Sequence, residues 1–371
     1  WALSASAENY GASERLLGAL AGGLLGGAAG SFGTIVPHLW PALVPTVAGG
    51  IASGADLGDV STLLTREWLV DGVRSGSMIV DDILLSALGV PAPLAAVLGD
   101  EGLGVTGLAF SAGAIVAAGS MVGLFRETPV ALVATTTLPS QKPPVGFEER
   151  FDRIPDSSTL DGAQVVIDKY EVPGQEPRFG VFIGGTVSFD PVAATEPWDM
   201  TSNMTNAVGT GSGSYDSVAL AMHEAGITAD SPVQFTGYSQ GGGTAAQLVA
   251  SGNYNTQGLV TFGGPTGQID LPEAVPTVIV EHRDDIVPAL GGTQQNVHAV
   301  IVERDVYGGH DIPQEPVFPA HRRGPYEETA VLMDAAHDER LTETVERLNS
   351  FAPVGATVTS TAYRFERMQS P

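Results

Sequence analysis

The chain has no cysteine and little positive charge. Without cysteine, its 371 residues contain no disulfide, no thiolate metal ligand and no cysteine nucleophile. Only 17 side chains are Lys or Arg against 42 that are Asp or Glu, which gives a formal net charge of −25. This charge argues against nucleic acid or an anionic membrane surface as a partner. The absence of cysteine fits either side of a membrane and leaves the compartment open.

Lysine is almost missing, since Lys142 and Lys169 are the only two, whereas alanine and glycine are abundant. This composition resembles that of proteins from GC-rich bacteria such as actinobacteria. The length suggests two domains, or one large domain with an extension, and a hydrophobic content of 43% is enough for a sizeable core. Because the first residue is Trp1 and not Met, we expect the sequence to be a fragment or a processed form.

Formal charge is absent from two long stretches, residues 16–55 and 102–125. Both are long enough to be considered as membrane spans. Three prolines interrupt the first stretch, both are rich in small residues, and no basic cluster flanks either one to set an orientation. We therefore favour tightly packed small-residue helices in a soluble or membrane-associated bundle. Residues 1–138 are assigned to a helical, Gly/Ala-rich domain.

The first twenty residues have apolar side chains at close to helical spacing, among them Tyr10, Leu16 and Leu20. A tryptophan followed by such a helix resembles the second half of a WXG-type helical hairpin, which is found in proteins tied to type VII secretion. The resemblance implies a secreted or cell-envelope location, although a cytoplasmic one is not excluded.

A polar, proline-containing linker is predicted at residues 139–146. From residue 147 to 371, strand patterns alternate with helix patterns, which predicts an α/β domain with parallel strand pairing. The predicted strands are 164–172, 179–183, 232–235, 258–262, 277–281 and 297–302. Helices are predicted at 214–225 and 244–250, and from near 325 and near 342. The first two strands form a hairpin, and a loop is predicted between residues 184 and 206.

Residues 235–243, with the sequence FTGYSQGGG, have the form of a nucleophile elbow. An apolar strand pattern leads into the stretch, and a small-residue helix pattern leads out of it. Gly237 and Gly241 flank Ser239 because side chains at these positions would collide with neighbouring backbone in so tight a turn. We therefore predict Ser239 as a nucleophile; the alternative is a glycine-rich loop without chemistry.

A serine nucleophile needs a base beside it and an acid that orients the base. After an elbow, the expected order along the chain is serine, acid, histidine. Asp285 is predicted as the acid because it follows a buried strand and precedes an Ile-Val-Pro segment that fixes the loop, with Asp284 as the alternative. His321 is predicted as the base because it lies between the last strand and a helix, with His310 as the alternative.

The tetrahedral intermediate of acyl transfer needs two backbone N–H donors, which form the oxyanion hole. The residue after the nucleophile, Gln240, is predicted to supply one. The second is expected from the loop after an earlier strand, where Gly184-Gly185 lets the backbone approach closely. Thr186 is predicted for this donor, with Val187 as the alternative.

The Gly185-Thr186 and Asp285-to-Pro288 segments are similar to those of class 3 lipases, and the Tyr-Ser-Gln elbow is more like that of cutinases and phage mycolyl esterases. Residues 147–371 thus resemble an α/β-hydrolase. The resemblance implies hydrolysis of carboxylic esters through an acyl-enzyme, without metal or cofactor. The expected partner is a small-molecule or lipid ester, with membrane or lipid contact assigned to the N-terminal domain. An alternative function is a secreted effector or interaction module on the same fold.

Overall fold

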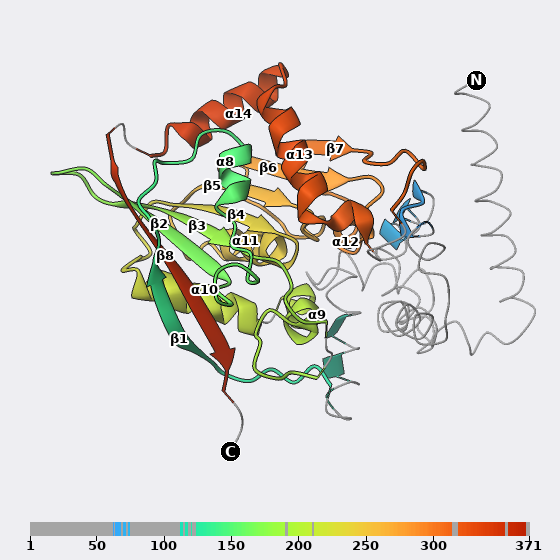
Figure 1. The fold of residues 1–371 in the computed structure, drawn as a ribbon, viewed down its shortest axis with the longest axis horizontal. Helices are drawn as coiled ribbons and strands as arrows, with labels where there is room; N and C mark the ends of the chain where they lie inside the picture. Colours follow the sequence, from blue (N-terminus) through green and yellow to red (C-terminus); the bar gives the residue numbers. More distant parts are fainter. Residues whose placement is uncertain are drawn as a thin grey trace, which may run out of the picture.

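The computed structural model describes residues 124–189, 192–209, 211–313, 318–352 and 355–368, with scattered positions in 62–74 and 112–120 (Figure 1). Three sequence predictions fall outside the described residues: the helix at 1–20, the uncharged stretch 16–55 and most of the stretch 102–125. The predicted all-helical N-terminal domain therefore stays a prediction. Among the helices that are described, none is long and apolar enough to cross a membrane.

An eight-stranded, largely parallel sheet forms the centre of the described structure, in the order β1-β8-β2-β3-β4-β5-β6-β7. Its strands are β1 (Val130–Thr137), β2 (Val165–Glu171), β3 (Arg178–Ile183), β4 (Val233–Tyr238), β5 (Thr256–Phe262), β6 (Thr277–His282), β7 (Val300–Arg304) and β8 (Thr357–Arg367). Strands β3 to β7 pair in parallel, whereas β1, β8 and β2 pair antiparallel. The predicted mixed α/β architecture with parallel pairing is confirmed.

Helices cover both faces of the sheet (Figure 1). They are α8 (Glu148–Asp152), α9 (Met200–Val208), α10 (Gly213–Glu224), α11 (Gln240–Ala250), α12 (Ile286–Ala289), α13 (Arg323–Asp334) and α14 (Glu339–Asn349), with a 3-10 turn at Pro319–His321. Residues of α10 and α11 share one hydrophobic cluster with the sheet, and residues of α8, α13 and α14 share a second. Each face of the sheet therefore has its own core.

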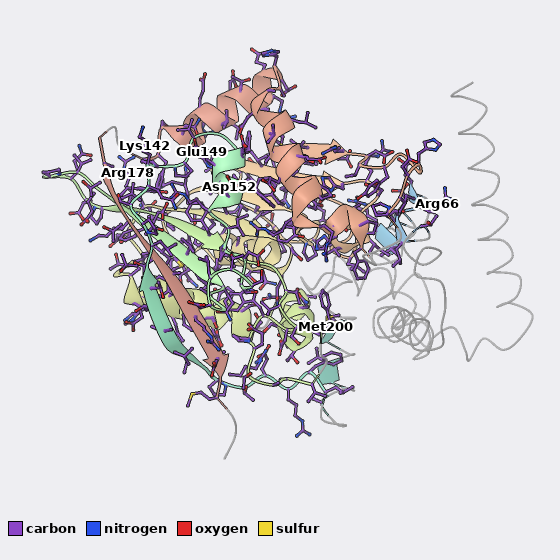
Figure 2. The ribbon with its side chains drawn as sticks, viewed as in Figure 1. Arg66, Lys142, Glu149, Asp152, Arg178 and Met200 are labelled. Carbon is purple, nitrogen blue, oxygen red and sulfur yellow. The ribbon has the colours of Figure 1, made fainter. Side chains whose placement is uncertain are left out.

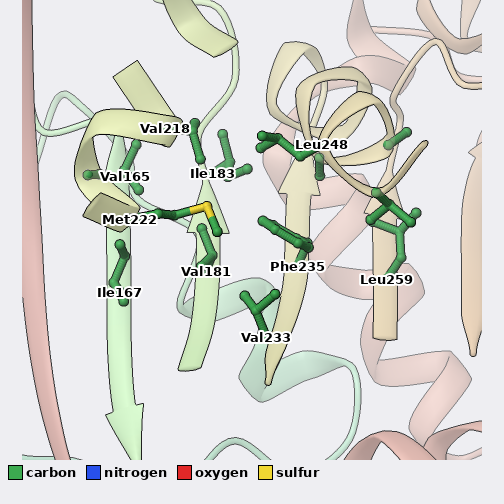
Figure 3. Packing of buried hydrophobic residues seen from close by; sticks show 14 of the residues in the cluster. Val165, Ile167, Val181, Ile183, Val218, Met222, Val233, Phe235, Leu248 and Leu259 are labelled. Carbon is green, nitrogen blue, oxygen red and sulfur yellow. The ribbon is translucent and has the colours of Figure 1, made fainter. Parts of the chain in front are cut away.

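Strand alternation divides the apolar side chains between these two cores. On β6, Ile279 belongs to the first cluster while Val278 and Val280 belong to the second, as the two-residue period of a strand requires. Figure 3 shows the first cluster, with Phe235 on β4 and Leu248 on α11 among its members. Burial of each such side chain contributes roughly 1.5–3 kcal/mol to the stability of the fold, so these contacts hold α11, which follows the elbow, against the sheet.

The antiparallel edge of the sheet differs from the prediction. Residues 130–137, assigned from the sequence to the N-terminal part, form edge strand β1, whose second half is exposed. Residues 357–367, for which no strand was predicted, form β8 between β1 and β2. The predicted loop between 184 and 206 also contains α9, which Asp199 caps by accepting a hydrogen bond from Ser202 N.

A segment of the N-terminal half packs against the second half of the chain. Leu64 and Val70 are buried in one small cluster with Ile286 and Ala289 of α12. Arg74 donates a 2.7 Å hydrogen bond to the carboxylate of Glu281, which is buried at the end of β6. Leu64, Val70 and Arg74 therefore tie this segment to α12 and to the end of β6. The predicted domain boundary at 139–146 stays a prediction.

Candidate active site

The turn between β4 and α11 forces Ser239 into an unusual backbone conformation, with φ of 56° and ψ of −123°. This positive φ is costly for a residue with a side chain. A Cβ atom added to Gly237 would lie 2.2 Å from the carbonyl oxygen of Gly241, and one added to Gly241 would lie 2.4 Å from the carbonyl oxygen of Ile183. The two glycines are therefore required by backbone contacts, as the sequence predicted.

Ser239, His321 and Asp285 lie in hydrogen-bond contact in that order. The distance from Ser239 Oγ to His321 Nε2 is 2.8 Å, and the distance from His321 Nδ1 to Asp285 Oδ2 is 2.6 Å. Ser239 directly follows β4, Asp285 lies in the loop after β6, and His321 is the last residue of the 3-10 turn, so three separate elements bring them together. Because β4 and β6 are parallel, their carboxyl ends lie at the same edge of the sheet.

The carboxylate of Asp285 accepts two further hydrogen bonds. Val287 N donates to Oδ1 at 2.9 Å, which caps the short helix α12, and the hydroxyl of Tyr326 donates to Oδ2 at 2.8 Å. Asp285 is 2% exposed and Tyr326 is fully buried. Burial and the neighbouring carboxylate raise the pKa of Tyr326 well above its ordinary value, so its hydroxyl keeps its proton and remains a donor. Asp285 is held in one orientation toward His321.

Asp284, the alternative acid, has a different environment. Its two carboxylate oxygens accept hydrogen bonds from the backbone N–H groups of Val306 and Tyr307, at 3.2 and 2.9 Å. Burial raises the pKa of Asp284 to about 6, although these two donors oppose the rise. Asp284 therefore ties the end of β6 to the loop after β7 and does not orient His321.

The alternative base, His310, is exposed, and among the described contacts its imidazole forms no hydrogen bond with Ser239 or Asp285. His282 is instead buried behind the site, where Nδ1 lies 2.7 Å from the carbonyl oxygen of Ala320 and Nε2 lies 2.8 Å from Thr329 Oγ1. Burial lowers the pKa of His282 to about 4, so it is neutral at neutral pH. Its contact with Ala320 supports the segment that carries His321.

The loop after β3 lies directly against the elbow. A Cβ atom added to Gly185 would lie 3.1 Å from Ser239 Cβ, so a glycine permits this close approach. The amide of Val187 already donates to Trp198 O at 2.8 Å, which removes the alternative oxyanion donor. Thr186 lines the cavity, and its hydroxyl accepts a 3.0 Å hydrogen bond from Asn203. Gln240 begins α11, so its N–H is one of the donors at a helix start that lack a partner within the helix.

A cavity of about 660 Å³ opens at Ser239 and His321. Its lining comes from the loop after β3, α9, the loop to α10, the first turn of α10, one face of α11, the loop after β5, α12 and Phe318. Apolar side chains are frequent in this lining: Phe189, Met200, Ala207, Val208, Ala250, Pro265, Ile269, Ile286, Val287, Leu290 and Phe318. The arrangement can admit an apolar molecule to the serine hydroxyl.

Sequence reasoning missed two residues that support the site. Tyr326 contacts the acid, and Asn203 holds the side chain of Thr186. Nothing in the local pattern distinguishes Tyr326 from an ordinary core residue of α13, and Asn203 fell within a stretch predicted as loop. Tyr238, the elbow residue before the nucleophile, also stacks on the His321 ring with centroids 5.4 Å apart.

Within the described residues, no group of three or more His, Asp or Glu side chains is placed to hold a metal ion. Ser239, His321 and Asp285 are in hydrogen-bond contact beside a cavity with many apolar lining residues. No protein-family model, curated protein or solved structure gives a significant match to this chain.

Proposed function

We propose that the chain is a serine hydrolase that cleaves carboxylic esters, with an α/β-hydrolase fold. The observation that supports this proposal is the chain of two contacts from Ser239 Oγ to His321 Nε2, at 2.8 Å, and from His321 Nδ1 to Asp285 Oδ2, at 2.6 Å. Ser239 lies in a turn with positive φ, and Ser239 and His321 both line the cavity. A serine hydroxyl is a weak nucleophile unless an adjacent base takes its proton, and this geometry supplies the base and its orienting acid.

In the proposed reaction, Ser239 Oγ attacks the ester carbonyl carbon while His321 Nε2 accepts the hydroxyl proton. The carbonyl oxygen becomes an oxyanion, and the N–H groups of Gln240 and Thr186 are assigned to stabilise it. His321 then gives the proton to the alcohol oxygen, and the bond between the carbonyl carbon and that oxygen breaks. A water molecule, losing its proton to His321, releases the acid from Ser239 by the same steps.

Asp285 stabilises the imidazolium that forms in each half of this reaction. It holds the Nδ1–H tautomer of His321, so that Nε2 is free to accept the serine proton. The three donors on its carboxylate, from His321, Val287 and Tyr326, hold it in the orientation that this role needs.

Hydrolysis of p-nitrophenyl butyrate by the full chain tests the proposal. We expect turnover by the native protein, and a loss of about a million-fold in kcat for Ser239→Ala, because removing the nucleophile removes the concerted action of the triad. Ser251→Ala is a matched control, since Ser251 lines the same cavity at the far end of α11. A folded native protein that is inert toward butyrate, acetate and longer esters would contradict the proposal.

A further inference from the structure

The cavity extends from Ser239 along one face of α11. Gln240, Gly243, Gln247 and Ala250 line it, and their spacing of three and four residues places them on the same side of the helix. At 1.5 Å per residue, the helix from Gln240 to Ala250 is about 15 Å long. The cavity is thus a groove as long as this helix, and we call it the α11 groove.

The middle of the α11 groove has apolar walls. Ala207 and Val208, at the end of α9, lie on one side, and Pro265 and Ile269 lie on the other. Amide side chains also line the cavity, and three of them already donate hydrogen bonds: Asn206 to Ser214, Gln247 to the carbonyl oxygen of Asn206 and Gln268 to that of Thr293. An alkyl chain is the ligand that gains most from such walls, at about 0.8 kcal/mol for each buried methylene.

The described lining of the groove contains no lysine or arginine. Its one carboxylate is Asp216, exposed in the first turn of α10. Figure 2 shows Lys142 and Arg178 at the upper left of the view, away from Met200, which lines the cavity. A carboxylate or phosphate on the ligand would find no cationic partner in this lining and would be repelled by Asp216.

The direction of an ester in the site follows from His321. The alcohol oxygen must face Nε2 to receive its proton, so the alcohol leaves on the side where Ile286, Val287 and Phe318 line the cavity. The other arm of the ester is the acyl chain, and the α11 groove is the part of the cavity that leads away from His321.

We infer that the substrate is an ester of a long, uncharged fatty acid, whose acyl chain lies along α11 with its end near Ala250 and Asp216. This inference rests on the proposed ester hydrolysis at Ser239. It identifies the acyl arm as the specificity-determining part and excludes acyl chains that carry an anionic end.

Ala250→Trp tests the length of the groove. Ala250 is exposed at the end of α11, so a tryptophan can be placed there without disturbing a core, and it would narrow the distal part of the groove. We expect kcat/KM for p-nitrophenyl palmitate to fall by at least about ten-fold, the loss of two or more methylene contacts, and kcat/KM for the butyrate ester to fall much less. Leu220→Trp is the control, since Leu220 is 39% exposed on α10 and outside the groove lining.

A second experiment tests whether the groove rejects a negative charge at the end of the acyl chain. It uses the mono-p-nitrophenyl ester of a long dicarboxylic acid, whose free end is a carboxylate. The native protein should turn it over more slowly than the palmitate ester, and Asp216→Asn should speed it a few-fold at low salt relative to the palmitate ester. The inference would be overturned by equal kcat/KM values across acyl lengths, or by equal losses of kcat/KM for butyrate and palmitate in Ala250→Trp. In either case, Ser239-dependent hydrolysis of butyrate would still support the proposed function. Failure of Ser239-dependent hydrolysis of butyrate and of every longer ester would instead remove the proposed function itself.

Discussion

Asp285→Asn is expected to lower kcat for ester hydrolysis by about ten-thousand-fold, the order of loss when the acid of a Ser-His-Asp triad becomes an amide. The carboxylate of Asp285 accepts hydrogen bonds from Val287 N, Tyr326 and His321, and an amide has one oxygen in place of two. If the amide oxygen faces Val287, its NH₂ group faces Nδ1 and selects the wrong tautomer of His321. Initial rates and circular dichroism of the variant, measured together, separate this effect from unfolding.

Asp284→Asn is the matched control, since it makes the same chemical change at the adjacent position. Asp284 accepts only backbone hydrogen bonds, from Val306 and Tyr307, so its amide should retain kcat within a few-fold and lose stability instead. If Asp284→Asn lost activity while Asp285→Asn retained it, the assignment of the acid would be wrong.

Arg74→Met is expected to destabilise the protein by about 3 kcal/mol, because it leaves the buried carboxylate of Glu281 without its cation. The ion pair is 2.7 Å long, and the side chains are 16% and 2% exposed. Burial raises the pKa of Glu281 above its ordinary value and Arg74 opposes the rise, so the variant should have a still higher pKa at this group.

The pH dependence of this destabilisation follows from the raised pKa of Glu281. A carboxyl whose pKa is higher in the folded protein binds more protons when folded, so stability falls as the pH rises from the unfolded value through the folded one. The loss in Arg74→Met should therefore be larger at about pH 8 than at about pH 5. Urea unfolding at the two pH values measures it, and adding Glu281→Gln should abolish the difference.

Arg283→Met is the control for this stability measurement. Arg283 and Glu67 form an ion pair between the same two segments of the chain, but both side chains are more than half exposed and the atoms are 3.9 Å apart. Its removal should change stability little. If Arg74→Met and Arg283→Met lowered the free energy of unfolding by equal amounts, the buried ion pair would contribute no more than the exposed one, which would contradict the prediction.

The sequence was sufficient to predict Ser239, Asp285 and His321 as candidate catalytic residues. A nucleophile elbow has glycines at fixed positions around its serine, and the acid and the histidine are expected to follow it in that order along the chain. The sequence could not decide between Asp284 and Asp285, which are adjacent and both follow β6. That choice depends on which carboxylate faces the imidazole. The backbone donors that hold Asp284, at Val306 and Tyr307, come from the loop after β7, 22 and 23 residues further along the chain.

The elements that were not predicted have weak local patterns. Residues 130–137 contain three consecutive threonines, and the outer half of this edge strand is exposed, so its sequence resembles a linker. Helix α9 consists largely of Thr, Ser, Asn and Met, of which the first three are poor helix formers. Buried contacts hold it, since Asn206 donates to Ser214 and Thr244. Tertiary contacts of this kind are not visible in a single sequence.

Covalent labelling by a fluorophosphonate tests the role of Ser239 most directly, because such a reagent reacts with a serine only where a base activates its hydroxyl. Intact-mass measurement of the native protein should show one adduct, and peptide mapping should place it on Ser239. Ser239→Ala should take up none, and His321→Ala should react far more slowly. A folded native protein that stays unlabelled, or one that is labelled at a different serine, would contradict the proposed nucleophile.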